Sequence, residues 1–313
     1  MQRPFAFLLV LLVAPAGATA QAQPAPAVDY ARLLDARFFP QQGRFMFGTP
    51  KKDILLFPPP GLDPYDVDGA YVVRDASGAV VVEEPLGSMQ ATNAPAFMTI
   101  GTRGGSDWGG ALAGGGAFTY EVVLDGDVIG AVPFTVTSSG SDDPFNPGTT
   151  FVVDGPWRTH AYFQHETDRP DYILHFNAWV APDDMASNTV SEVSIRRNGE
   201  EVAWGSTHVD LSYGWGRAEY RLLTPGSRPA PDGRRPNPNN FTIQDVTPGT
   251  YEILLSDADG NVFRRFTVEA GSGTFPAHAR SDVNHAREGF LTPRRIGGSS
   301  LNKQFSVYWV VDA

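Results

Sequence analysis

The chain of 313 residues contains no cysteine. No disulfide can therefore stabilise the fold, and hydrophobic cores must do so instead. The absence also excludes a lipoprotein anchor, because that modification requires a cysteine at the cleavage site.

Basic residues are in short supply, with 24 Lys and Arg against 35 Asp and Glu, a formal net charge of −11. A surface that binds a phosphate backbone has to be basic. The acidic balance therefore argues against nucleic acid as a partner.

Long apolar runs are missing beyond the N-terminus. The run from Phe5 to Val13 follows Met-Gln-Arg and precedes an Ala-x-Ala site that ends at Ala20. This is the pattern of a secretory signal peptide, and the run is about half of the ~20 residues that span a bilayer. We expect residues 1–20 to be removed, and the mature chain, without a transmembrane segment, to reach the periplasm, the cell surface or the medium.

Turn-forming residues are abundant, with 33 glycines and 26 prolines between short runs of Val, Ile, Tyr and Phe. This alternation is typical of an all-β protein. Residues 21–43 differ: an Ala/Pro linker over 21–27 precedes a short helix that Asp29 would cap and Pro40 would end. Its apolar stripe would consist of Tyr30, Leu33, Leu34 and Phe38.

The chain repeats itself in three places. Thr119–Leu124 (TYEVVL) recurs as Thr250–Leu255 (TYEILL), and each copy is followed by a turn and Phe-Thr-Val. Two earlier pairs match in the same order, namely Val73–Val80 with Ile195–Val202 and Asp53–Phe57 with Asp171–Phe176. The pattern predicts a duplicated domain. We place the domains at 44–138 and 150–270, the linker at 139–149 and a strand-bearing C-terminal extension at 271–313.

Alternation with a period of two predicts which side chains the two hairpins bury. They are Tyr120, Val122, Leu124, Phe134 and Val136 in the first copy, and Tyr251, Ile253, Leu255, Phe266 and Val268 in the second.

The segment Val246-Thr-Pro-Gly-Thr-Tyr251 resembles a piece of immunoglobulin-like and fibronectin-III-like modules, in which a Pro-Gly-Thr turn leads into a Tyr-led core strand. The first copy, Gly116–Tyr120, lacks the proline. The resemblance implies two tandem immunoglobulin-like β-sandwich domains; it implies a fold and no function.

None of the enzyme motifs considered is complete in this sequence. Ser106 does not belong to a Gly-x-Ser-x-Gly motif, because Trp108 occupies the position of the second glycine. His165-Glu166 lacks the second histidine of a zinc protease, and Ser300-Leu-Asn-Lys303 lacks its partner motifs. We therefore expect no catalytic residue and no cofactor.

Asp257, Asp259 and Asn261 space their side-chain oxygens as a calcium loop does. Such a loop needs glycine where Val262 stands and glutamate where Val268 stands. The same residues form ordinary hairpin turns. The turn is the favoured interpretation, and we expect no metal.

Histidines gather in the second copy, and a hairpin that pairs Glu166 with Asp171 sorts the side chains onto two faces. The apolar face is Ala161, Phe163, Leu174, Phe176 and Ala178; the other is His160, Tyr162, Gln164, His175, Asn177 and Trp179. The second face suits a contact with another domain or protein, a glycan, or a metal, and it could also be a solvated face. Two histidines without a third ligand make a poor metal site.

Two long loops and the C-terminus offer further candidates. Trp108 lies in a glycine-rich loop, while Arg234 and Arg235 lie in a Pro/Arg/Asn-rich one. Tryptophan and arginine often anchor interfaces. Residues 305–313 predict a strong strand that closes its own protein or adds to a partner's sheet.

Taken together, these features favour an exported, non-enzymatic binding or scaffolding protein with a protein partner in a cell-envelope or extracellular assembly. A secreted glycan-binding module built on Tyr162, Trp179, Asn177 and Gln164 is the alternative. A metal-dependent hydrolase built on His160 and His175 is a third.

Overall fold

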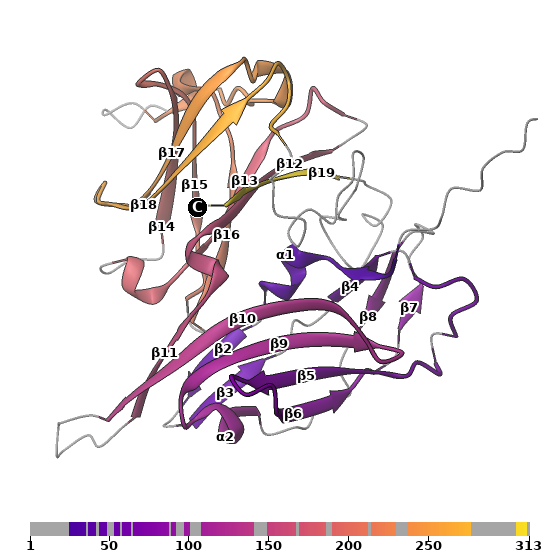
Figure 1. The fold of residues 1–313 in the computed structure, drawn as a ribbon. Helices are drawn as coiled ribbons and strands as arrows, with labels where there is room; N and C mark the ends of the chain where they lie inside the picture. The colour runs from indigo at the N-terminus through magenta and orange to yellow at the C-terminus, as the bar shows by residue number, and fades with distance from the viewer. Residues whose placement is uncertain are drawn as a thin grey trace, which may run out of the picture.

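The described chain is built almost entirely of antiparallel sheets, which confirms the predicted all-β class (Figure 1). The computed structural model describes residues 25–35, 37–41, 44–48, 53–56, 58–63, 65–87, 89–91, 97–100, 108–140, 149–166, 169–185, 190–211, 214–229, 237–276 and 305–311. The predicted signal peptide lies outside these residues. Within them, no helix is long and apolar enough to cross a membrane.

Two sheets form the first half of the protein. One has the order β1 (Ala27–Val28), β4 (Asp53–Leu56), β8 (Phe97–Ile100), β7 (Gln90–Ala91). The other has the order β11 (Thr149–Asp154), β10 (Asp127–Gly140), β9 (Gly116–Leu124), β5 (Gly69–Asp75), β6 (Val80–Pro85). A small sheet of β2 (Arg37–Gln41) and β3 (Arg44–Gly48) and two short helices, α1 (Tyr30–Leu33) and α2 (Trp108–Leu112), accompany them.

Two further sheets form the second half. One has the order β16 (Gly216–Arg221), β13 (His175–Val180), β12 (His160–Glu166), β19 (Phe305–Val311). The other has the order β15 (Glu200–His208), β14 (Val190–Arg197), β17 (Gly249–Asp257), β18 (Val262–Ala270). The described residues of this half also include four single turns of 3-10 helix: η1 (Pro156–Arg158), η2 (Pro182–Asp184), η3 (Pro225–Ser227) and η4 (Ile243–Asp245).

The five-stranded sheet of the first half and one four-stranded sheet of the second share a strand order. β6-β5-β9-β10 in the first corresponds to β15-β14-β17-β18 in the second, so the two repeated hairpins hold the same place. Their registers differ, because Tyr120 pairs with Val132 whereas Tyr251 pairs with Val268. The turns explain the difference. Asp125-Gly126 is a tight turn with both φ angles positive, whereas a longer turn follows Asp257.

The predicted core residues of both hairpins are buried, except that Val268 is only partly so. In each strand, side chains two residues apart point to the same face, and the apolar face meets the opposite sheet. Leu255, for example, is fully buried in the core of the second half.

The boundary between the halves differs from the predicted one. β10 continues through Ser138, Ser139 and Gly140, which we had placed at the end of the first domain and in the linker. Residues 150–154, which we had placed in the second domain, pair with β10 as β11. Pairing with a long neighbouring strand satisfies backbone groups that a free linker would leave to water.

Two described segments, residues 29–33 and 305–311, lie near the ends of the chain in sequence and in the middle of the molecule in space. The carboxylate of Asp29 accepts a hydrogen bond from the backbone N–H of Ala31 (3.0 Å) and so caps α1 as predicted. The helix is shorter than expected, because residues 37–41 enter β2. The C-terminal strand β19 pairs with β12, so it closes its own protein's sheet. Figure 1 shows α1 between the two halves.

Candidate functional site

The hairpin of β12 and β13 sorts its side chains as the sequence predicted, although the register is two residues away from the predicted one. Tyr162 pairs with Asn177, and Gln164 with His175. Residues 171–174 leave the hairpin, because the backbone N–H of Leu174 donates to the carbonyl of Phe241 instead (2.9 Å). A shift by two preserves the faces. Ala161, Phe163, Leu174, Phe176 and Ala178 all lie in the core of the second half.

The opposite face is buried as well. The structure brings together all six side chains that the sequence singled out, and each is at most 5% exposed: His160, Tyr162, Gln164, His175, Asn177 and Trp179. Tyr162 and Trp179 belong to the same hydrophobic cluster as Leu33 and Leu34 of the α1 region and the core of the first half. This face is therefore the joint between the halves, and it is not a solvated surface.

Aromatic rings fill the joint. The ring centroid of Trp309 lies 4.9 Å from that of Tyr162 and 6.4 Å from that of Trp179. Tyr30 of α1 lies 5.6 Å from both His160 and Trp309. Three segments that are distant in the chain, α1, the hairpin and β19, thus pack into one layer.

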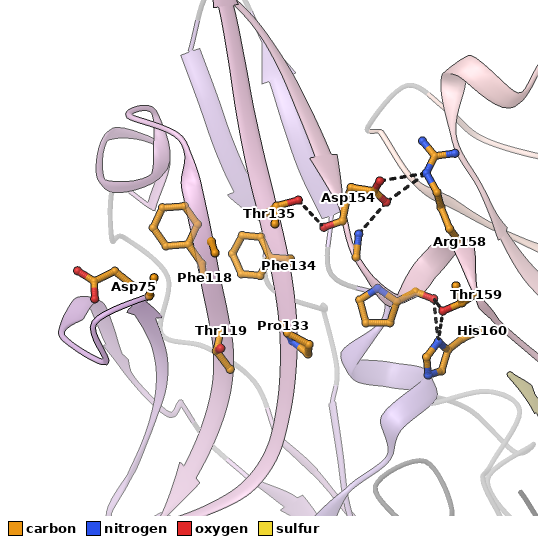
Figure 2. Close-up of a pocket in the computed structure, with 14 residues that line it drawn as sticks. Asp75, Phe118, Thr119, Pro133, Phe134, Thr135, Asp154, Arg158, Thr159 and His160 are labelled. Carbon is orange, nitrogen blue, oxygen red and sulfur yellow. Dashed lines mark hydrogen bonds and ion pairs between the residues drawn. The ribbon is translucent and has the colours of Figure 1, made fainter. Parts of the chain in front are cut away.

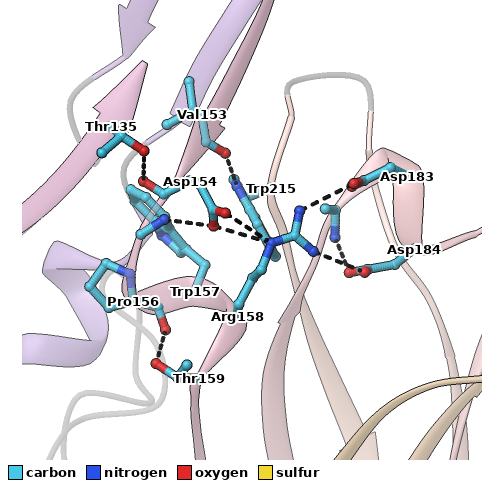
Figure 3. Close-up of polar contacts among 12 residues, drawn as sticks. Thr135, Val153, Asp154, Pro156, Trp157, Arg158, Thr159, Asp183, Asp184 and Trp215 are labelled. Carbon is cyan, nitrogen blue, oxygen red and sulfur yellow. Dashed lines mark hydrogen bonds and ion pairs between the residues drawn. The ribbon is translucent and has the colours of Figure 1, made fainter. Parts of the chain in front are cut away.

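A charged network lies beside this layer (Figure 3). The guanidinium of Arg158 is held by three carboxylates: Asp154 and Asp183 at 3.1 Å and Asp184 at 3.5 Å. It also lies over the indole of Trp215, 5.0 Å from the ring centroid. The Trp215 N–H donates to the carbonyl of Val153 (2.9 Å), which joins β11 to the segment before β16.

A second arginine is buried nearby. Arg264 donates to the carboxylate of Asp184 (2.5 Å) and to the carbonyl of Trp179. Burial lowers the pKa of Arg264, which the charge of Asp184 partly opposes. A buried guanidinium needs such partners, because its desolvation is otherwise costly.

The two histidines considered for a metal do not face one another. His175 pairs with Gln164, four residues along β12 from His160, so along the strands the two histidines are about 13 Å apart. The Nδ1 atom of His160 lies 2.9 Å from the carbonyl of Pro156, and that of His175 lies 3.0 Å from the Glu219 carboxylate. Among the residues that the structure describes, no three His, Cys, Asp or Glu side chains form a metal-binding group.

Asp257 forms the turn that the sequence favoured over a calcium loop. Its Oδ1 accepts hydrogen bonds from the backbone N–H groups of Asp259 (3.0 Å) and Asn261 (2.9 Å). The carboxylate oxygens are thus engaged in shaping the turn.

The loop candidates are placed only in part. Trp108 is the first residue of α2 rather than a loop residue, and its side chain is outside what the structure describes. Arg234 and Arg235 lie outside the described residues altogether. Arg228 anchors the start of that loop, where it lies over the ring of Trp204 (4.6 Å) and binds the Glu201 carboxylate (2.8 Å).

A pocket of about 610 Å³ opens next to the joint (Figure 2). It is bounded by the end of β5 and the turn after it, by the start of β9, by the middle of β10, and by the segment from the end of β11 through η1 to the start of β12. The lining residues are Asp75, Ala76, Ala117, Phe118, Thr119, Pro133, Phe134, Thr135, Asp154, Gly155, Pro156, Arg158, Thr159 and His160.

Arg158, Arg264 and this pocket were not predicted from the sequence. One signal was present: Arg264 shares a strand face with Phe266 and Val268, and a charged residue on a core-facing position implies a buried partner. No local pattern pointed to Arg158, because its three carboxylates come from β11 and η2.

No protein-family model matches the chain, and no curated protein is recognisably similar to it in sequence.

Proposed function

We propose that this chain is an exported, non-enzymatic binding or scaffolding protein, built from two tandem immunoglobulin-like β-sandwiches, which serves a cell-envelope or extracellular assembly. The shared strand order of the two halves supports the fold assignment. So does Tyr251, whose hydroxyl donates to the carbonyl of Thr247 and accepts from its N–H (both 3.0 Å). A tyrosine that bonds back to the preceding corner is a hallmark of such sandwiches.

The joint carries the functional proposal. One hydrophobic cluster runs from the first half into Tyr162, Trp179, Trp215 and Trp309 of the second. Two domains that share a core move as one body, whereas domains on a flexible linker move independently. A rigid pair of sandwiches suits a protein that holds partners at a set spacing.

The buried and partly buried charged side chains of the second half pair with one another, which supports a role in holding the fold together. Arg158 pairs with Asp154 of β11, in a sheet of the first half, and with Asp183 of η2, in the second half, so this arginine links the two halves. Arg264 pairs with Asp184 within the second half. The aromatic strip on which a glycan-binding module would rest, Tyr162 and Trp179, is buried in the same joint. Binding a glycan there would require the joint to open.

The proposal is tested by purifying the tagged full chain from the envelope fraction of its own cells after mild crosslinking. We expect a mature N-terminus after Ala20 and a stoichiometric protein partner. Retention of the chain in the cytoplasm with its N-terminal segment would contradict the proposal. So would a chain that purifies from the envelope fraction without a protein partner and binds to polysaccharide columns.

A further inference from the structure

We infer that Asn198, at the tip of the hairpin of β14 and β15, is a site of spontaneous chemical modification. Its side-chain amide is lost as ammonia when the backbone nitrogen of Gly199 attacks it, which leaves an aspartyl or an isoaspartyl residue. Water is the co-reactant. The inference goes beyond the proposed function and does not depend on it.

The sequence places this asparagine where the attack is least hindered. No other asparagine of the chain precedes a glycine. Glycine has no Cβ, so no side chain shields its backbone nitrogen from the neighbouring amide. The space around Gly199 is open as well, because a Cβ built there would have no atom within 4 Å beyond its chain neighbours.

The hairpin leaves both reacting groups exposed and without hydrogen bonds. Asn198 and Gly199 are the two loop residues between Arg197 and Glu200, which pair with one another. Their φ angles are 53° and 84°, and a type I′ turn requires two positive values. In the part of the chain that the structure describes, neither the Asn198 amide nor the Gly199 N–H has a hydrogen-bond partner.

The reaction balances with water alone. The Gly199 nitrogen gives its proton to hydroxide and bonds to Cγ of Asn198, while the Cγ–Nδ2 bond breaks and the nitrogen leaves as ammonia. The product is a five-membered succinimide ring. Water then opens the ring at one of its two carbonyl carbons. Opening at Cγ gives aspartate, whereas opening at the backbone carbonyl carbon gives isoaspartate.

The isoaspartyl product changes the hairpin itself. Its main chain runs through Cγ, which adds one carbon to the turn. A two-residue turn fixes the register of the strands that it joins. The added carbon should therefore disturb the pairing of Arg197 with Glu200 and of Arg196 with Glu201.

Asn261 is an internal control within the same protein. It lies in the turn between β17 and β18, but its Nδ2 donates to the Asp257 carboxylate (3.0 Å). The β-branched Val262 follows it. A hydrogen bond has to break, and a side chain crowds the attacking nitrogen, before this amide can react.

The test incubates the folded full chain in mildly alkaline buffer and then cleaves it after glutamate. Mass spectrometry follows the exchange of NH2 for OH in peptide 193–200, which contains Asn198, and in peptide 253–269, which contains Asn261. We expect amide loss at Asn198 to be at least about tenfold faster, because the Asn261 amide is held by its hydrogen bond.

Two variants sharpen the result. Trp309→Ala weakens the joint in another sheet and raises the unfolded fraction, yet the rate at Asn198 should stay within about twofold of the wild type, because an exposed hairpin tip opens locally. Asn198→Asp has the charge of the products and a normal backbone. The isoaspartyl form, isolated by ion exchange, should melt below this variant.

Equal rates at Asn198 and Asn261 would overturn the inference. So would a rate at Asn198 that rises with the unfolded fraction in Trp309→Ala, since the folded turn would then be unreactive. An isoaspartyl form that melts at the same temperature as Asn198→Asp would refute the predicted disturbance of the hairpin.

Discussion

Trp179 and Trp309 lie parallel, with ring centroids 6.4 Å apart and an interplanar angle of 2°. One belongs to β13 and the other to the C-terminal strand β19, which is joined to the sheet through β12. The C-terminal strand is therefore part of the joint between the halves and, at the same time, part of a sheet of the second half.

Trp309→Ala should destabilise the protein by about 3–5 kcal/mol, because it leaves a cavity between Tyr30, Tyr162 and Trp179. The free energy of unfolding from denaturant titration measures this. Val262→Ala, at a side chain that is 49% exposed, is the control and should change stability little. An effect no larger than that of the control would mean that β19 does not hold the joint.

Leu255→Ala should cost roughly 2–5 kcal/mol, because Leu255 is fully buried in the second core. The melting temperature reports this loss. An unchanged melting temperature would show that the strand register of β17 is wrong.

Arg264 and Arg265 are adjacent but opposite in environment. Arg264→Ala should cost about 3–5 kcal/mol, since it leaves the Asp184 carboxylate buried without its closest partner. Arg265, whose side chain is 60% exposed and pairs with Glu252, should cost less than about 1 kcal/mol on the same change. Similar losses for the two variants would show that Arg264 is not buried in the folded protein.

Asn177→Leu should leave stability unchanged or raise it. Asn177 is 1% exposed, and neither its Nδ2 nor its Oδ1 has a hydrogen-bond partner in the described part of the chain. An apolar group of similar shape removes that desolvation cost. Asn177→Asp should destabilise, because it buries a charge. A marked loss of stability in Asn177→Leu would indicate an ordered water or ligand at the amide.

His165 should make stability depend on pH in mildly acidic solution. Burial lowers the pKa of His165 below its ordinary value of about 6.5. Between the folded and unfolded pKa values the unfolded chain binds more protons, so stability is full above about pH 6.5 and falls as the pH drops towards the folded pKa. The loss of melting temperature between about pH 7.5 and 5.5 should shrink in His165→Gln and persist in the control His208→Gln. Equal losses in all three proteins would contradict this.

The sequence by itself determined the class of the fold and the faces of its strands. Alternation in the segments around Tyr120 and Tyr251 identified the buried side chains, because neighbouring residues of a strand point to opposite sides. The same rule sorted the β12–β13 hairpin correctly even though its register was predicted two residues away. The repeat also anticipated the strand order common to both halves.

Only the tertiary structure decided what the second face of that hairpin packs against. Periodicity shows that Tyr162 and Trp179 share a face, but it carries no information on Trp309 or Tyr30, which reach that face from the two ends of the chain. The extent of β11 and the carboxylates around Arg158 were equally hidden, because both depend on pairings between distant segments. Local patterns record how a segment meets its own strand neighbours, whereas the joint and the pocket form where separate segments meet.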